Sequence, residues 1–476
     1  MSAPTSIAQA PGPVLSTLEP DGSRRKLHPR VSPGRFHAGR RWVGYALIAL
    51  FVGLPYVELG GKPAILLDLL RREFTFFGAT FRPADGAILM LLGLTIALAV
   101  FLVTALFGRV WCGWGCPQTV YLEWVFRPIE RLFEGGPAGS RRLDARGGWS
   151  WRRAAKWAVY LALAFALAHT FLSYFVGAST VATWVRSSPA AHPVGFGVVV
   201  AVTALMFADF AWFREQTCIV ACPYGRLQSV LLDRNSLIVG YDHGRGEPRG
   251  KAPRGRRARA LVVVPDETPK VGDCVDCRAC VATCPTGIDI RDGLQMECIG
   301  CAQCIDACDA IMDRLDRPRG LIRYTSETEL AGGKRRIWRA RTLIYPAALA
   351  LVAVLFVGQV RARTEADVWV LRPDGAPFAL LDDGAVSTPV RIKIENRTGA
   401  ARTYTVRVDG VPGARVIDPR GSYPVAPGAS TIVPLFVISP PAAFVHGRHA
   451  AQVVVADDGG WHTTLAVTLL GPEAAP

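Results

Sequence analysis

Eight of the cysteines form the stretch Cys274-Val-Asp-Cys277-Arg-Ala-Cys280-Val-Ala-Thr-Cys284-Pro285, followed by Cys298-Ile-Gly-Cys301-Ala-Gln-Cys304-Ile-Asp-Ala-Cys308-Asp309. Each half has the C-x2-C-x2-C-x3-C spacing of a bacterial two-cluster ferredoxin, in which the fourth cysteine of each run binds the other cluster. This spacing predicts two [4Fe–4S] clusters. The predicted ligand sets are Cys274, Cys277, Cys280 and Cys308 for one cluster, and Cys298, Cys301, Cys304 and Cys284 for the other. Paired C-x2-C units also bind zinc, so two zinc sites are the alternative.

The other four of the twelve cysteines lie in two short motifs, Cys112-Gly-Trp-Gly-Cys116-Pro117 and Cys218-Ile-Val-Ala-Cys222-Pro223. No cysteine follows Cys308. Cysteines confined to such motifs favour metal chemistry over structural disulfides.

Half of the residues are hydrophobic, and the apolar residues gather in long stretches. A bilayer crossing needs about 20 apolar residues. We therefore predict five crossings, at residues 42–59, 86–107, 154–177, 193–213 and 342–360. Residues 62–81 are too polar to cross and are predicted to lie at the membrane surface.

The formal net charge of +15 is explained by membrane topology. Lys and Arg are concentrated before the first span, in residues 108–153 and in residues 214–340, which contain the eight-cysteine stretch that we call the cassette. The positive-inside rule places these three regions in the cytoplasm. Because successive spans cross the membrane in alternate directions, the C-terminal portion is then predicted to lie on the side opposite the cytoplasm. No other feature supports nucleic-acid binding, so no nucleic-acid partner is predicted.

The two short motifs each follow an apolar span and each continue through a proline into an amphipathic run, which indicates an internal duplication. Cysteines four residues apart lie on one face of a helix. We predict that Cys112, Cys116, Cys218 and Cys222 present four thiols to one metal, as a candidate copper and catalytic site. The alternative is four inert buried thiols. Within the spans, His169 and Asp209 are further candidates because ionisable groups in a bilayer tend to be functional.

After the last span, short alternating or β-branched runs are separated by turn residues, which is typical of an immunoglobulin-like β-sandwich. The six predicted strands are 368–371, 390–395, 403–408, 431–438, 451–455 and 463–469.

We therefore predict a multi-span α-helical membrane protein with an inserted two-[4Fe–4S] ferredoxin-like domain and a C-terminal immunoglobulin-like β-sandwich. The predicted segments are a disordered basic cytoplasmic tail (1–41), a membrane domain with four spans and both short motifs (42–241), a flexible basic linker (242–265), the two-cluster domain (266–325), a connector with the fifth transmembrane helix (326–362) and the periplasmic sandwich (363–476).

Three segments resemble one known family. They are Cys-Gly-Trp-Gly-Cys-Pro-Gln-Thr at 112–119, Phe-Arg-Glu-Gln-Thr-Cys-Ile-Val-Ala-Cys-Pro-Tyr-Gly-Arg at 213–226, and the cassette through Pro-Arg-Gly-Leu-Ile-Arg-Tyr at 318–324. In this order they are similar to the cytochrome c oxidase accessory proteins of the FixG/RdxA/CcoG type. The resemblance runs from about residue 42 into the C-terminal sandwich.

The resemblance implies a protein of the bacterial cytoplasmic (inner) membrane that reduces Cu(II) to Cu(I) during assembly of cbb3-type cytochrome c oxidase. It implies two [4Fe–4S] clusters as cofactors and copper as substrate. The implied partners are copper ions, an unidentified electron donor, and oxidase assembly factors or subunits. Two other interpretations remain open: a membrane quinol dehydrogenase that passes electrons through its clusters, and a non-enzymatic oxidase assembly scaffold.

Overall fold

The computed structural model describes residues 16–18, 23–59, 62–81, 85–250, 272–362, 364–371 and 375–472. The chain divides into two compact units, Met1–Phe356 and Val357–Pro476, which we describe separately. Most of the predicted linker 242–265 lies outside the described residues, but its beginning forms the short helix α11 (His243–Gly246).

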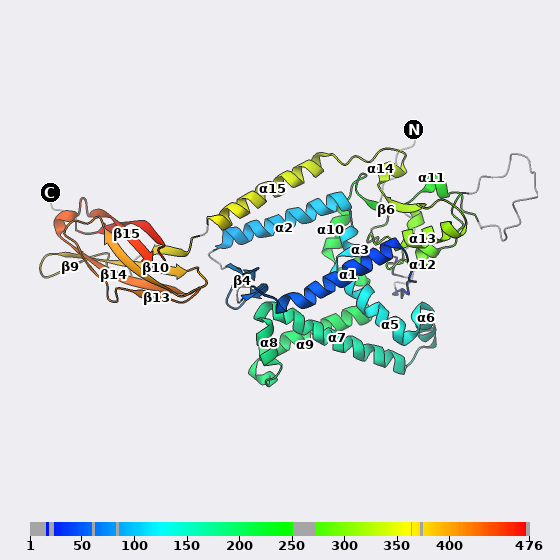
Figure 1. Ribbon diagram of the computed structural model, residues 1–476, viewed down its shortest axis with the longest axis horizontal. Helices are drawn as coiled ribbons and strands as arrows, with labels where there is room; N and C mark the ends of the chain where they lie inside the picture. Colours follow the sequence, from blue (N-terminus) through cyan, green and yellow to red (C-terminus); the bar gives the residue numbers. More distant parts are fainter. Residues whose placement is uncertain are drawn as a thin grey trace, which may run out of the picture. The chain divides into compact units, whose positions relative to one another are not determined.

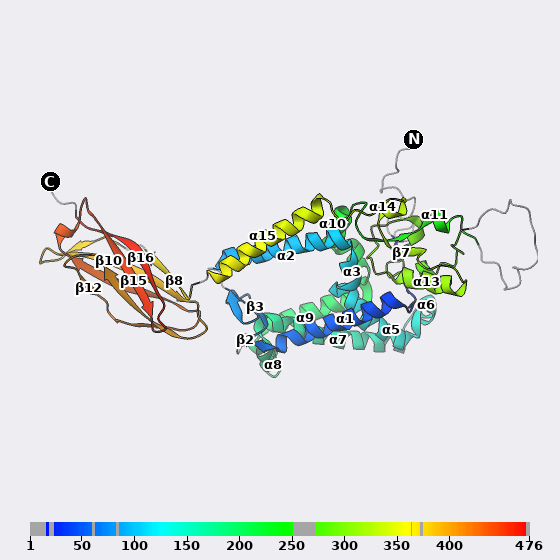
Figure 2. The ribbon, with the colours of Figure 1, turned by 45° about the horizontal axis from the view of Figure 1, so that its top comes forward.

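Four helices among the described residues are long and apolar enough to cross a membrane. They are α2 (Gly86–Phe107), α7 (Trp151–Val176), α9 (Pro193–Ala208) with its π-helical extension η5 (Asp209–Phe213), and α15 (Ala340–Arg361). These correspond to four of the five predicted crossings. Helices α2 and α15 run side by side in both views (Figures 1 and 2), and the rings of Phe101 and Tyr345 lie 6.4 Å apart between them.

The first predicted crossing differs from the structure. Helix α1 (Arg35–Gly53) begins earlier than predicted and gives way to a 3-10 turn, η1 (Leu54–Tyr56), that contains Pro55. With Arg40 and Arg41 inside it, α1 is not among the four helices that qualify by length and composition. Near its end it contacts α7, where the Phe51 and Tyr174 rings stack at 5.4 Å and the Tyr174 hydroxyl donates to the Phe51 carbonyl at 2.7 Å.

Between α1 and α2 the chain forms small antiparallel sheets instead of another crossing, in agreement with the polarity of this segment. Their strands are β1 (Glu58–Leu59), β2 (Lys62–Pro63), β3 (Ile65–Asp68), β4 (Glu73–Phe76) and β5 (Ala79–Phe81). Strand β4 pairs with both β3 and β5.

Short helices link the long ones, and several begin with proline, which suits the first turn because no internal amide bond is lost there. They are α3 (Val110–Trp114), α4 (Pro117–Tyr121), the π-helical turn η3 (Leu122–Phe126), α5 (Arg127–Glu134), α6 (Gly136–Arg146), α8 (Ala178–Trp184), the 3-10 turn η4 (Pro189–Ala191), the π-helical turn η6 (Thr217–Ala221) and α10 (Pro223–Leu231).

A two-stranded sheet closes the cluster domain. Strand β6 (Ile238–Tyr241) precedes the cassette, and β7 (Ile322–Thr325) follows it and pairs antiparallel with β6. The helical elements of this domain are α12 (Ala279–Ala282), the 3-10 turn η7 (Ile290–Asp292), α13 (Gln303–Arg314) and α14 (Glu327–Leu330). Its core buries Ile305, Met312, Leu321 and Ile322.

The predicted disordered tail is wrong for residues 23–41. Helix α1 occupies its end, and the residues before α1 lie on the cluster domain: the Arg30 amide donates to the Ala282 carbonyl at 2.8 Å, and Leu27 is buried beside Gly287. Residues 1–15 and 19–22 lie outside the described part of the chain.

The second unit is a β-sandwich. One sheet has the order β12-β14-β10-β8, with β9 also paired to β10, and the other has the order β13-β11-β15-β16. The strands are β8 (Ala366–Leu371), β9 (Ala379–Leu380), β10 (Val386–Asn396), β11 (Arg402–Asp409), β12 (Arg415–Ile417), β13 (Tyr423–Val425), β14 (Ser430–Ser439), β15 (Arg448–Asp457) and β16 (His462–Leu470); a 3-10 turn, η8 (Pro441–Ala443), precedes β15.

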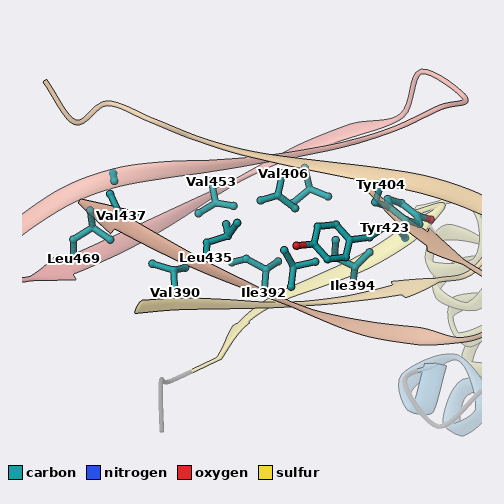
Figure 3. Close-up of a cluster of buried hydrophobic side chains, with 14 of the residues drawn as sticks. Val390, Ile392, Ile394, Tyr404, Val406, Tyr423, Leu435, Val437, Val453 and Leu469 are labelled. Carbon is teal, nitrogen blue, oxygen red and sulfur yellow. The ribbon is translucent and has the colours of Figure 1, made fainter. Parts of the chain in front are cut away.

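All six predicted strands are present. On β10 every second residue is buried, so one face of the strand lines the core and the other faces away from it. The two sheets enclose side chains such as Ile392, Tyr404, Leu435 and Val453 (Figure 3). This confirms the predicted immunoglobulin-like architecture.

Candidate functional site

The cassette cysteines line two neighbouring cavities. Four of them, Cys274, Cys277, Cys280 and Cys308, line one cavity. A second cavity is lined by Cys284, Cys298, Cys301 and Cys304, with Cys280 at the wall it shares with the first. The structure thus places the fourth cysteine of each run with the first three cysteines of the other. We call these the first and second cluster cavities.

In each cysteine loop, two residues have a left-handed backbone conformation. Asp276 and Arg278 have φ of 50° and 54°, and the equivalent Gly300 and Ala302 have φ of 66° and 59°. Non-glycine residues visit this region at a cost of order 1 kcal/mol, so the surrounding fold must enforce it. The turns bring three successive cysteines of each loop to the wall of one cavity.

The donor sets fit [4Fe–4S] clusters, because each cavity is lined by four thiols from the two ferredoxin runs. A zinc ion would need its ligands gathered at about 2.3 Å from one point. Across the residues that the structure describes, no three His, Cys, Asp or Glu side chains are arranged to hold a single metal ion.

The two short cysteine motifs have the same local structure. Cys112 lies in α3 and Cys218 in η6, whereas Cys116 and Cys222 directly precede the prolines that begin α4 and α10. Both Cys116 (φ −65°, ψ 126°) and Cys222 (φ −77°, ψ 109°) have extended backbone. The shared conformation supports the internal duplication inferred from the sequence.

The four thiols of these motifs, the membrane-edge thiols, lie in one neighbourhood. Burial raises the pKa of Cys112 to about 11. Burial also raises the pKa of Cys218 to about 12, and negative charge on Cys116, Cys112 and Cys222 raises it further. In the described chain they are not gathered tightly enough to hold a single metal ion, so the four-thiol copper site stays a prediction.

The first motif touches the second cluster cavity. Cys112 is buried together with Ile299 and Cys301. A Cβ built on Gly113 would lie 2.7 Å from the Cys301 Cα, and one on Gly300 would lie 3.2 Å from the Arg109 carbonyl carbon. Only glycine allows two backbones to approach so closely. The contact places the Cys112 motif directly beside the loop of the second cavity.

Two polar side chains hold Cys112. Gln228, which is fully buried, accepts from the Cys112 thiol at 2.9 Å and donates to the Tyr224 hydroxyl at 2.6 Å. The buried Arg109 donates to the Met296 carbonyl, and its charge opposes the effect of burial on the pKa of Cys112. Sequence analysis missed both residues, because neither belongs to a cysteine motif.

A buried network of ion pairs lies next to the cluster domain. Arg214 binds both carboxylate oxygens of Glu130 at 2.9 Å, and Lys156 binds Glu134 at 2.6 Å. Burial alone would raise the pKa of Glu123, but Arg127 and Arg40 lower it to about 2.

Glu123 links this network to the cassette. It accepts from Arg127 at 2.6 Å and from Gln303 at 3.1 Å, and Gln303 lies between the second-cavity cysteines Cys301 and Cys304. The sequence offers only a weak signal for the network, namely carboxylates and arginines spaced through an otherwise amphipathic run.

The two intramembrane candidates have different surroundings. Asp209 accepts from Gln118 at 3.1 Å and from the Thr217 hydroxyl, so it ties the two cysteine motifs together. His169 instead lines a cavity with Trp184 and His192, formed by α7, α8 and α9. His169 lies 13 residues after Lys156, which corresponds to about 20 Å along α7. The structure therefore places Asp209, but not His169, with the membrane-edge thiols.

Comparison with known protein families matches three segments. Residues 213–327 match a family described as a 4Fe-4S dicluster domain, and residues 89–135 match a 4Fe-4S binding domain. Residues 356–472 match the IG-like fold at the C-terminal of FixG.

Full-length relatives cover most of the chain. Protein RdxA of Cereibacter sphaeroides is 35% identical over 439 residues, covering 88% of this chain and 90% of RdxA. The nitrogen fixation protein FixG of Rhizobium meliloti is 33% identical over 483 residues, covering 91% of this chain and 90% of FixG. A crystal structure of a FixG-related protein from Vibrio parahaemolyticus aligns with 23% of this chain and 98% of that protein, at 16% identity and a TM-score of 0.21. With its two cluster cavities, apolar helices and C-terminal sandwich, this chain belongs to the FixG/RdxA family of iron–sulfur electron-transfer proteins.

Proposed function

We propose that this protein reduces Cu(II) to Cu(I) at the membrane-edge thiols and so supplies Cu(I) for the assembly of cbb3-type cytochrome c oxidase. The observation that carries the proposal is the contact between Gly113 and Cys301, which sets the Cys112 motif against the second cluster cavity. When bound, [4Fe–4S] clusters supply single electrons at low potential. Each Cu(II) ion takes up one electron, and no bond to the substrate other than metal coordination is made or broken.

The residues of the chain bind copper and favour the reduced product. Thiolates select Cu(I) over harder ions, so binding by Cys112, Cys116, Cys218 and Cys222 stabilises the product more than the substrate. Arg109 supports the thiolate form of Cys112. Gln118 follows the first motif, and Thr217 directly precedes the second. Both donate to Asp209, which holds the two motifs together.

The arginine distribution supports a cytoplasmic location for the cassette and the membrane-edge thiols, with the β-sandwich on the periplasmic side of a bacterial cytoplasmic membrane. The proposed partners are an electron donor at the cytoplasmic face, copper ions, and an oxidase subunit or assembly factor for the sandwich.

A single-turnover assay tests the proposal. Anaerobically purified protein is reduced with dithionite, desalted and mixed with Cu(II) and a Cu(I)-specific chelator. Two clusters should yield about two Cu(I) per chain. The variants Cys112→Ser/Cys116→Ser and Cys218→Ser/Cys222→Ser should each lose this reaction while their cluster absorbance and iron content stay unchanged. Val230→Ser is the matched control, because Val230 lies on α10 beyond Cys222 and is 80% exposed.

Other outcomes distinguish the alternatives. Full activity per cluster in both double variants would remove copper chemistry from the membrane-edge thiols. Cluster reduction by a quinol without any cupric reduction would indicate a quinol dehydrogenase. Neither activity would indicate an assembly scaffold.

A further inference from the structure

The Arg40 side chain is a buried cation whose terminal nitrogens are not satisfied by the protein. It is 1% exposed, and its Nε donates to the Gly113 carbonyl at 2.8 Å. Neither Nη1 nor Nη2 has a hydrogen-bond partner among the described residues. A buried charge without a hydrogen-bonded partner is strongly unfavourable. Glu123 is close enough for its charge to interact with that of Arg40, but Nη1 and Nη2 still lack the hydrogen-bond acceptors that an anionic group beside them would supply.

The second cluster cavity is the neighbour that would hold this group. Arg40 binds the carbonyl of Gly113, and Gly113 packs on the backbone of Cys301. The charges of Arg40 and Glu123 both act on Cys301, with opposite signs. Glu123 interacts with Arg40 through its charge but does not satisfy these nitrogens, because its oxygens accept from Arg127 and Gln303 and neither accepts from Arg40.

A second guanidinium lies near the loop of the second cavity. Arg109 donates to the carbonyl of Met296, two residues before Cys298, and its Nε has no partner among the described residues. Its backbone touches Gly300, the residue between the cavity cysteines Cys298 and Cys301. Thus two buried cations flank the second cavity.

Among the described buried residues that line the first cluster cavity, no arginine has a nitrogen without a hydrogen-bond partner. Its buried arginine, Arg291, is neutralised by Asp289 and Asp276, each at 2.6 Å. A further carboxylate, Asp309, directly follows the cavity cysteine Cys308. Cys277, by contrast, is exposed. Solvent exposure and local charge thus differ between the two cavities.

We propose that Arg40, supported by Arg109, raises the reduction potential of the cluster in the second cavity above that of the first. Reduction adds one negative charge to a cluster, and a fixed nearby cation stabilises that state without any proton transfer. The deeper burial of the second cavity would have the opposite effect and lower its potential. Electrons would therefore pass from the first cavity to the second, beside Cys112. The inference deepens the proposed function, but its potential is measurable without copper.

An anaerobic redox titration followed by electron paramagnetic resonance tests this inference on the full-length protein. Arg40→Gln removes the charge and should lower one of the two midpoint potentials. The expected loss of electron affinity is at least about tenfold, which corresponds to a shift of about 59 mV for one electron. Arg40→Lys keeps the charge and should retain most of the wild-type value. The control is Arg41→Gln, the adjacent but exposed residue of α1, which should leave both midpoints unchanged.

The affected midpoint must belong to the second cavity. Cys277→Ser, which alters a first-cavity ligand, identifies the other midpoint, and Arg40→Gln should leave that one in place. Unchanged midpoints in Arg40→Gln with full iron content, or a shift confined to the Cys277-sensitive step, would overturn the inference. If Arg40→Gln loses iron, Arg109→Gln decides, because it should lower the same midpoint. If Arg40→Gln shifts the midpoint as expected but the wild-type protein does not reduce Cu(II), the proposed function is wrong and this inference still holds.

Discussion

Gly113 lies directly against Cys301, so that the membrane-edge motif and the loop of the second cluster cavity are in backbone contact. The two residues are 188 positions apart in the sequence, and neither motif alone indicates that they meet. In the proposed function, electrons pass between the cluster domain and the thiols at this contact.

The first prediction concerns this contact. Gly113→Ala would place a Cβ 2.7 Å from the Ile299 carbonyl oxygen and from the Cys301 Cα, so one of the two backbones must move. We expect slower cupric reduction and a lower melting temperature in detergent. Gly93→Ala in α2 is the matched control, because its Cβ would meet open space. It should be neutral or slightly stabilising, by up to about 1 kcal/mol. Equal behaviour of the two variants would show that the contact is unimportant.

The second prediction concerns cluster content and ligand exchange. Anaerobically purified protein should contain about eight iron and eight sulfide per chain. Cys284→Ser should damage the cluster held mainly by Cys298, Cys301 and Cys304, and Cys308→Ser should damage the other, as seen by electron paramagnetic resonance. Damage to the cluster of the same run would contradict the crossover. An iron content near twelve would instead indicate a third cluster at the membrane-edge thiols.

The third prediction concerns pH. With pKa values of about 11 and 12, the Cys112 and Cys218 thiols are protonated at neutral pH without metal. Cu(I) must displace these protons, so its affinity should rise with pH, by up to about tenfold per pH unit for each proton released. Competition with a calibrated chelator between pH 6 and 9 measures the slope. Cys112→Ser should lower the slope by about one unit, and a pH-independent affinity would exclude these thiols as ligands.

The fourth prediction concerns the buried ion pairs. Arg214→Leu leaves the Glu130 carboxylate buried without its bidentate partner. Removing one member of a buried pair typically costs about 3–5 kcal/mol. Melting of the purified protein should show a large loss. Arg319→Leu breaks an exposed pair with Asp313, at 2.6 Å, and should cost no more than about 1 kcal/mol. Similar losses in both variants would mean that burial of the pair is irrelevant.

The fifth prediction concerns topology. Reporter fusions near residues 145 and 290 should be cytoplasmic, and fusions near 185 and 420 should lie on the other side of the membrane. A cytoplasmic signal near both 290 and 420 would mean that α15 does not cross. Reporters before α1 and near residue 70 on the same side of the membrane would instead identify α1, with its Arg40 and Arg41, as a helix that does not cross.

The sequence by itself determined the features that depend on short-range patterns. Cysteine spacing predicted the two cluster sets, apolar length predicted α2, α7, α9 and α15, and alternation predicted six strands of the sandwich. Each of these signals is contained within about 30 residues, because metal-binding loops, bilayer thickness and strand pleating all impose fixed local periods.

Only the tertiary structure decided how these parts meet. The contact of Gly113 with Cys301, the burial of Arg40 and the pairing of Arg214 with Glu130 each join segments far apart in the chain. The tertiary structure also decided that residues 23–34 are ordered against the cluster domain, although their apolar residues show no periodic spacing. A buried charge or a close glycine contact depends on which surface comes to cover it, and that surface is set by the packing of the whole unit, not by neighbouring residues in the sequence.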